Sequence, residues 1–268
     1  MPRFFTHQLL APGCTIELEP SAARHVQVLR LQPGDAITLF NEVGNALGNG
    51  LGSALGSALG SGLEDQAGVD GEYAARILAM GRTTVSVVVT DFVRTSTGPA
   101  RVVHLAVGMP ANDRMDWLVE KATELGVTSI TPLTTERSVL RLQGERLDKK
   151  LAHWRGVAIA ASEQCGRSWV PLIGVPVSLA AYLKTCLGNT LEADHARLVL
   201  SLRCGALPLR DVASSYTAFT LLSGPEGGLS AAEEVVAQGA GFSALTLGPR
   251  TLRAETAPLA ALAALQLR

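Results

Sequence analysis

The chain has 268 residues, of which 47% are hydrophobic and 18% are charged, and its formal net charge at pH 7 is −1. This length fits one large domain or two smaller ones, and the near-neutral charge excludes a global electrostatic attraction to nucleic acid or anionic membranes. The longest apolar runs are too short to cross a bilayer, and residues 1–7 lack the apolar region of a signal peptide, so we expect a cytoplasmic protein.

The cysteines are too few for a disulfide framework, and no pair has the spacing of a metal site. They are Cys14, Cys165, Cys186 and Cys204. We therefore expect reduced thiols and no bound metal.

The N-terminal third has strand-forming segments on either side of a Gly-rich tract. Residues 35–40 and 84–89 are rich in β-forming residues, and a Pro33-Gly34 turn precedes the first segment. Residues 43–63 are built from Gly, Ser, Ala and Leu, a composition that disfavours helix and strand, so we expect a flexible inserted loop. We predict a small β-barrel domain over residues 1–95, followed by a linker at 95–99.

From residue 100 to residue 268, strand and helix patterns alternate. This alternation favours an α/β domain with a largely parallel sheet and helices on its faces. Ser230 and Glu233 form a capping box that predicts the start of a helix. The predicted strands are 102–107, 127–133, 198–202 and 219–222, and the longer predicted helices are 113–125 and 145–164.

Two loops that contain glycine and proline follow apolar runs near the C-terminus. They lie in Leu221–Gly228 and Leu245–Arg253, and loops at the carboxyl ends of strands are where open α/β sheets bind ligands. The first loop has neither a Walker A lysine nor the G-x-G-x-x-G pattern, and Glu226 would repel phosphate. A nucleoside-like ligand without exposed phosphates fits better, and the alternative is a plain tight turn into a helix.

Charged residues elsewhere add candidate functions with structural alternatives. Arg250 and Arg253 could bind phosphate or stabilise developing negative charge, whereas Glu255 could act in the site or pair with Arg253. Arg167 follows a helix break at Gly166 and could project into a cleft. From residue 137 to residue 155 there are six basic and two acidic residues, a local patch that could bind RNA or form a solvated helix face.

Taken together, these segments resemble the RsmE family of 16S rRNA uridine N3-methyltransferases, within the SPOUT superfamily. The resemblance covers nearly the whole chain outside the Gly-rich tract. It departs from the family at Ala111 and Asn112, which replace a usual basic residue. The matching segments are His25 with Val28–Arg30, Lys121–Val127, Glu136-Arg137, Glu145–Leu147 with Lys149–Leu151, Glu163–Arg167, Gly224–Ser230 and Leu247–Thr256.

The resemblance implies a PUA-like N-terminal β-barrel, a C-terminal SPOUT domain with a deep trefoil knot, and a homodimer. Residue patterns alone would predict an open sheet without a knot. The resemblance also implies that S-adenosylmethionine is bound in the knot, with S-adenosylhomocysteine as the product. The implied cofactor-binding residues are Leu200, Leu222, Ser223, Gly224, Pro225, Glu226, Gly227, Gly228, Leu247, Gly248, Arg250 and Leu252.

The implied reaction is methylation of N3 of one uridine, U1498, in 16S rRNA of the small ribosomal subunit. Catalysis would align nitrogen, methyl and sulfur and stabilise the uridine anion. An arginine against the uracil oxygens would stabilise this anion, and a carboxylate would orient the base or accept its proton. The candidate catalytic residues are Arg253, Arg167, Glu163 and Glu255, and the candidate RNA contacts are Arg24, Arg30, Arg137 and Arg141.

Two alternatives remain at this stage. The chain could be a SPOUT methyltransferase that acts on another RNA such as tRNA, or a non-catalytic rRNA-binding module. A nucleotide-dependent enzyme on a conventional open sheet would need a phosphate-binding motif, which the sequence lacks.

Overall fold

The computed structural model describes residues 1–41, 71–95, 100–111, 113–188, 194–203, 205–212 and 214–267. They form two compact units, and each is described here by itself. The first comprises Met1–Gly98 with Ser162–Val170, and the second comprises Pro99–Ala161 with Pro171–Arg268. The tract predicted as a loop at 43–63, most of the predicted linker, Asn112 and Cys204 lie outside the described residues.

The first unit contains a five-stranded mixed sheet in the order β1-β3-β4-β5-β2. Strands β1 and β3 pair in parallel, and the other pairs are antiparallel. Alternate residues of β5 (Val85, Val87 and Val89) are fully buried, as expected for a strand with one face on a core. The strands are β1 (Arg3–Phe5), β2 (Thr15–Glu17), β3 (Ala36–Phe40), β4 (Gly71–Met80) and β5 (Val85–Arg94).

Helix α1 (Pro20–Val28) packs on the core of this sheet. Its buried residues Ala22, Ala23 and Val26 recur at helical spacing. Pro20 occupies the first turn, where the missing N–H leaves no hydrogen bond broken. The turn predicted at Pro33-Gly34 is present, because Gly34 has a φ of 95° and donates its N–H to the Ile77 carbonyl (2.8 Å).

The second unit is built on a parallel sheet in the order β11-β13-β10-β12-β6-β7-β8, with β9 paired to β7. Each pairing recorded in this sheet is parallel. The α/β class with a parallel sheet is therefore confirmed for this unit. The strands are β6 (Val102–Gly108), β7 (Ser129–Thr134), β8 (Leu172–Ile173), β9 (Val177–Ser178), β10 (His195–Leu200), β11 (Leu207–Pro208), β12 (Ala218–Ser223) and β13 (Ser243–Thr246).

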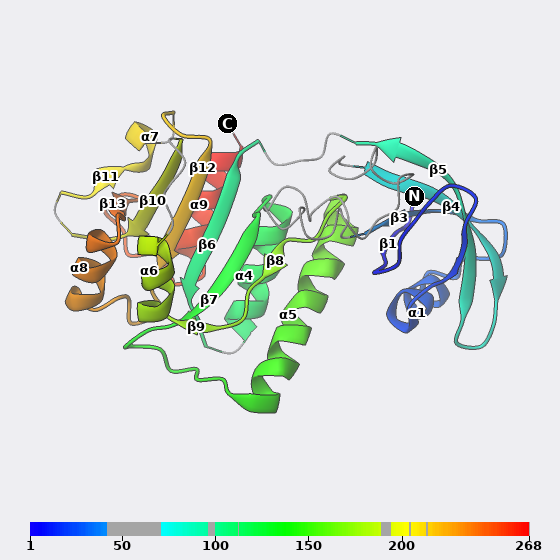
Figure 1. Ribbon diagram of the computed structural model, residues 1–268, viewed down its shortest axis with the longest axis horizontal. Helices are drawn as coiled ribbons and strands as arrows, with labels where there is room; N and C mark the ends of the chain where they lie inside the picture. Colours follow the sequence, from blue (N-terminus) through cyan, green and yellow to red (C-terminus); the bar gives the residue numbers. More distant parts are fainter. Residues whose placement is uncertain are drawn as a thin grey trace. The chain divides into compact units, whose positions relative to one another are not determined.

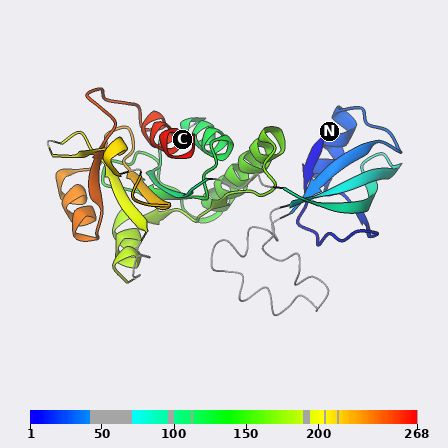
Figure 2. The same ribbon diagram turned by 90° about the horizontal axis from the view of Figure 1, so that it is seen from above.

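Helices cover both faces of this sheet (Figures 1 and 2). Helix α9 (Thr256–Gln266) packs on β12, β6 and helix α4 (Asp113–Glu124), and both helices lie behind the sheet in the view of Figure 1. Helices α6 (Leu179–Gly188) and α8 (Ala231–Gly239) lie in front, over a core that includes Leu222. Burial on both faces explains why the strands read as nearly continuous apolar runs.

Two further helices complete the described fold, α5 (Gly144–Cys165) and the single turn α7 (Leu209–Val212). The fully buried Trp154 of α5 donates its indole N–H to Asp116 of α4 (3.0 Å). The last four residues of α5 belong to the first unit. The expected division at residues 95–100 does not include this contribution from a distant segment.

Strand order places β10 between β12 and β13. Val199 is in register with Leu222 of β12, and Leu200 is in register with Leu245 of β13. Because the three strands run in parallel, the segments that follow them emerge at the same edge of the sheet. The two loops singled out in the sequence are thereby brought together.

Candidate functional site

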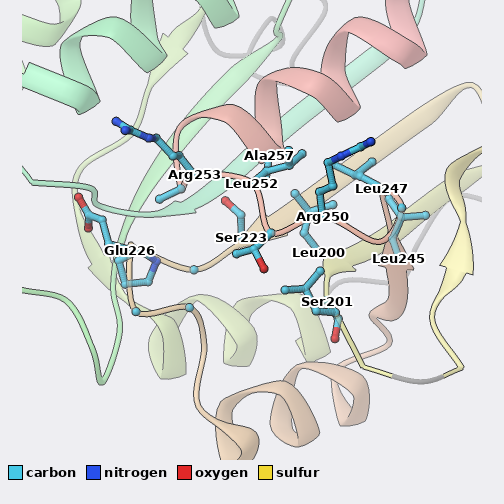
Figure 3. A pocket seen from close by; sticks show the side chains of 18 of the residues that line it. Leu200, Ser201, Ser223, Glu226, Leu245, Leu247, Arg250, Leu252, Arg253 and Ala257 are labelled. Carbon is cyan, nitrogen blue, oxygen red and sulfur yellow. The ribbon is translucent and has the colours of Figure 1, made fainter.

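A pocket of about 500 Å³ lies at the carboxyl ends of β10, β12 and β13 (Figure 3). The predicted cofactor-binding residues line it, except Leu222, which is fully buried in the core beneath α6 and α8. Its other lining residues are Arg114, Ser201, Leu202, Leu245, Thr251, Arg253, Ala254 and Ala257. The structure therefore places both predicted loops around one cavity.

The first wall is the tight loop Gly224–Gly228 between β12 and α8. Gly228 donates its N–H to the Pro225 carbonyl (2.8 Å). A Cβ at position 224 would lie 2.5 Å from the carbonyl carbon of Gly228, so this close approach of two backbone segments requires glycine. The predicted capping box is confirmed, since Ser230 and Glu233 exchange hydrogen bonds at the start of α8.

The side chain of Glu226 attaches this loop to residues outside it. The Glu226 Oε1 atom accepts a hydrogen bond from the backbone N–H of Ala111 (2.9 Å) and one from Arg114 (3.2 Å). The carboxylate thus connects the β12–α8 loop to the residues between β6 and α4. Its role in the described structure is to orient the loop.

The second wall runs from the end of β13 to the first turn of α9. Gly248 has a φ of 109°, and its N–H donates to Thr246 Oγ1 (3.2 Å). The carbonyl of Arg253 accepts the N–H groups of Thr256 and Ala257 (both 3.0 Å), which fixes the entry into α9. Figure 3 shows the guanidinium groups of Arg250 and Arg253 on opposite sides of the lining, where both residues are exposed.

Two buried side-chain oxygen atoms of the second unit have no hydrogen-bond partner among the described residues. They are the Ser223 Oγ, in a residue that lines the pocket, and the Glu255 Oε2, in a residue that is 7% exposed. A buried polar atom left without a partner is unfavourable unless a ligand or water satisfies it. The leucines at positions 200, 245, 247 and 252 provide apolar lining for a flat, uncharged ring.

The other two candidate catalytic residues belong to the first unit. Glu163 accepts the backbone N–H of Phe5 (3.0 Å) and lies 3.5 Å from His25 Nδ1. Burial raises the pKa of Glu163 above its ordinary value, and the Phe5 N–H and His25 partly offset this effect. Arg167 is buried, with its guanidinium 3.7 Å from the ring centroid of Trp169. Glu163 and Arg167 therefore both contact other residues within the first unit.

The four residues predicted to contact RNA are all exposed, but one of them forms a hydrogen bond within the fold. Arg24 and Arg30 belong to the first unit, and Arg30 has a left-handed φ of 57°. Arg141 is exposed in the segment before α5. Arg137, by contrast, donates a hydrogen bond to the carbonyl oxygen of Gly227 (2.6 Å).

Several lining residues were not predicted from the sequence. Ser201 and Leu202 directly follow β10, so the rule that ligands bind beyond strand ends would have found them. Arg114 lies on α4 and reaches the pocket through its ion pair with Glu226, a contact that the sequence does not reveal. Ala257 has no sequence signal, because a small apolar residue in a helix is ordinary.

Among the described residues, no group of three or more His, Cys, Asp or Glu side chains could hold a metal ion. None of the helices described is both long and apolar enough to cross a membrane.

Comparisons with known proteins agree on one group. The RNA methyltransferase domain family matches residues 97–266. The ribosomal RNA small subunit methyltransferase E of Bacillus subtilis is 30% identical over 284 residues, covering 99% of this chain and 96% of that protein. That of Rickettsia conorii is also 30% identical, over 273 residues, with 99% and 95% coverage.

Solved structures give the same result. The Neisseria gonorrhoeae ribosomal RNA small subunit methyltransferase E, bound to S-adenosyl methionine, is 32% identical with a TM-score of 0.80, covering 100% of this chain and 97% of that one. A Legionella pneumophila protein described as a methyltransferase in complex with bound SAM is 32% identical with a TM-score of 0.81, covering 99% and 96%.

Proposed function

This chain belongs to the family of ribosomal RNA small subunit methyltransferase E, and on that basis we propose that it transfers a methyl group from S-adenosylmethionine to ribosomal RNA of the small subunit. One observation carries the proposal. The two loops that the resemblance assigns to the cofactor line a single pocket, with apolar side chains and the Ser223 Oγ, which has no partner among the described residues. The absence of a phosphate motif in these loops agrees with a nucleoside that carries no phosphate.

We propose the following roles for the pocket residues. The leucines that line the pocket bind the adenine ring, and the Gly224–Gly228 loop approaches the ligand closely through its backbone. Ser223 Oγ donates a hydrogen bond to the ligand or accepts one from it. Arg250 and Arg253, on opposite sides of the lining, face the groups of the ligand and substrate that carry negative charge.

The finer proposal for the acceptor is N3 of a single uridine. The cofactor supplies an electrophilic methyl group, whose bond to sulfur breaks as the bond to N3 forms. Arg253 stabilises the negative charge that develops on the uracil as its N3 proton leaves. We assign the role of proton acceptor to Glu255, which follows the pocket-lining Ala254 and whose buried Oε2 has no partner among the described residues.

Glu163 and Arg167 remain candidates from the sequence. A Glu163 carboxyl with a raised pKa is a better proton acceptor near neutral pH than an ordinary carboxylate. Arg167 is held on Trp169, and Arg3 donates a hydrogen bond to its carbonyl (3.0 Å). Variants of these two residues that retain cofactor affinity and a near-normal turnover rate would remove them from the chemistry.

The finer features of architecture are also proposals. We infer that the first unit is a PUA-like barrel and that the second contains a trefoil knot. The chain path supports the knot, because β13 lies beside β10 while the following helix α9 packs on β12, β6 and α4. We further infer a cytoplasmic homodimer, as the resemblance to the family implies.

The decisive experiment follows labelled methyl groups from S-adenosylmethionine into assembled small subunits, free 16S rRNA and tRNA. Label on N3 of one small-subunit uridine, located by nuclease digestion and mass spectrometry, is the expected result. Label in tRNA alone would favour the tRNA alternative. Cofactor binding without transfer to these RNAs would favour a binding module, and a failure to bind the cofactor would contradict the proposal.

A further inference from the structure

The segment that follows β7 is attached to the Gly-rich loop by side-chain hydrogen bonds. Arg137 Nη1 donates to the carbonyl of Gly227 (2.6 Å) and, at longer range, to that of Leu229 (3.5 Å). The neighbouring Glu136 donates its backbone N–H to Glu233 Oε1 (2.7 Å), in the capping box of α8. Two successive residues therefore hold the loop and the helix start that follows it.

The Arg137 side chain also packs directly on the loop. A Cβ at position 227 would lie 3.2 Å from both Cβ and Cδ of Arg137, which is closer than ordinary van der Waals contact. Gly227 lines the pocket. Arg137 therefore supports the backbone of a pocket-lining residue through both a hydrogen bond and side-chain packing.

Arg137 itself projects from a well-defined turn. Ser138 Oγ accepts the N–H of Thr135 (2.9 Å), and Ser138 N–H donates to the Thr135 carbonyl (3.2 Å). Both residues are buried. Past this turn the chain becomes exposed again, at Val139 and Arg141. Arg137 thus differs from the basic residues that follow it, because its turn is anchored in the fold.

We propose that Arg137 is a positioning residue for the cofactor pocket, acting through the Gly227 carbonyl, rather than an RNA contact. This inference rests on the proposed function. Three glycines make the loop flexible, so its ordering on ligand binding carries an entropic cost. A charge-assisted hydrogen bond at Gly227, with Glu226 bonded to Ala111 and Arg114, holds the loop in its binding conformation before the ligand arrives.

The test compares two substitutions at Arg137 with a matched substitution in the same basic segment. Arg137→Gln removes the charge and the guanidinium, Arg137→Lys keeps the charge, and Arg141→Gln removes an exposed charge four residues away. Calorimetry gives the dissociation constant for S-adenosylmethionine, and filter binding gives that for small-subunit rRNA. Thermal unfolding of each variant without ligand verifies that it is folded.

We expect Arg137→Gln to weaken cofactor binding about tenfold and Arg137→Lys to recover part of that loss. The KM for the cofactor should rise while kcat at saturating cofactor changes less than about twofold. The affinity of Arg137→Gln for RNA should stay close to that of the unmodified protein. Arg141→Gln should bind the cofactor normally.

Unchanged cofactor affinity in a folded Arg137→Gln protein would overturn the inference, and a loss of RNA affinity in its place would assign Arg137 to the RNA. If Arg137→Gln does not fold, Gly227→Ala provides the second test, since its methyl group displaces the Arg137 side chain without removing it. Normal cofactor binding by Gly227→Ala would then overturn the inference. If the unmodified protein does not bind the cofactor, the proposed function itself fails, which is a separate result.

Discussion

The carboxylate of Glu226 lies 2.9 Å from the backbone nitrogen of Ala111 and accepts its hydrogen bond. This contact links the pocket loop after β12 to the residues that precede α4. The donor is the main-chain N–H of residue 111, so this hydrogen bond does not depend on which side chain stands at that position. The departure from the family pattern at Ala111 therefore leaves this connection in place.

We predict that Glu226→Ala weakens cofactor binding severalfold, because the loop loses its attachment to Ala111 and Arg114. Glu226→Gln keeps an acceptor for the Ala111 N–H and should lose less than Glu226→Ala. The pair with Arg114 is partly exposed, so removing its charge costs only about 0.2–1 kcal/mol. Calorimetry on both variants checks this order, and equal losses would show that the charge matters more than the hydrogen bond.

Ser223 provides a prediction in which stability and binding change differently. Its Oγ is buried without a partner in the described structure, so Ser223→Ala should leave the free energy of unfolding unchanged or slightly raised. Cofactor affinity should fall by about 0.5–1.5 kcal/mol, the typical net value of one hydrogen bond. Urea unfolding and calorimetry measure the two effects.

Ser201 is the matched control for this prediction. It also lines the pocket, but its Oγ donates to Glu234 Oε2 (3.0 Å) and accepts the N–H of Arg203 (3.2 Å). Ser201→Ala should therefore destabilise the protein without ligand. If Ser223→Ala destabilised the fold to the same degree, Ser223 would have a structural partner rather than a ligand.

Gly224→Ala should disrupt the pocket, because its methyl group would lie 2.5 Å from backbone atoms of Gly228 and Leu229. We expect a loss of stability of about 1–3 kcal/mol and a loss of measurable cofactor binding. Gly156→Ala is the control, since a Cβ there meets no atom within 4 Å in the middle of α5. It should stabilise the protein by about 0.4–1 kcal/mol, because alanine favours helix. Urea unfolding of each variant gives its change in the free energy of unfolding, and calorimetry gives its affinity for the cofactor.

His104 predicts a pH dependence of stability. Burial, and to a lesser degree the nearby His195, whose ring centroid is 5.9 Å away, together lower the pKa of His104 from 6.5 to about 4. Its hydroxyl neighbour is Ser129, at 2.7 Å from Nδ1. Below pH 6.5 the unfolded chain binds a proton that the folded chain does not, so stability falls as the pH decreases toward 4.

The expected contribution is up to about 2 kcal/mol between pH 7 and pH 4.5. His104→Gln should reduce this part of the pH dependence. Urea unfolding at several pH values gives the slopes. A slope in His104→Gln equal to that of the unmodified protein would show that other groups account for the acid sensitivity.

The sequence predicted those parts of the fold whose signals are local. The helix expected at 113–125 is observed at Asp113–Glu124, and the Ser230–Glu233 capping box starts α8 as predicted. The strand expected at 198–202 is observed at His195–Leu200, since its first half carries His195 and Arg197 and lacks an apolar pattern. Polar residues in the first half of a strand interrupt the apolar pattern, so the sequence predicts that the strand begins later than it does.

Contacts between distant segments were beyond the reach of the sequence. The two loops could be expected to meet, because both follow strands of one parallel sheet. The hydrogen bond from Phe5 to Glu163 spans 158 residues, and the one from Arg137 to Gly227 spans 90 residues. No periodicity or motif encodes such pairs, so the sequence could not predict that Arg137 bonds to the Gly227 carbonyl.

Ala257 belongs both to the lining of the pocket and to the first turn of α9. A molecule that touches this turn stabilises a helix whose apolar residues Leu259, Leu262 and Leu265 are buried in the second unit. Occupancy of the pocket should therefore slow amide hydrogen exchange along the last helix of the chain. The C-terminal helix would then report whether the methyl donor is bound, although most of its residues do not contact the pocket.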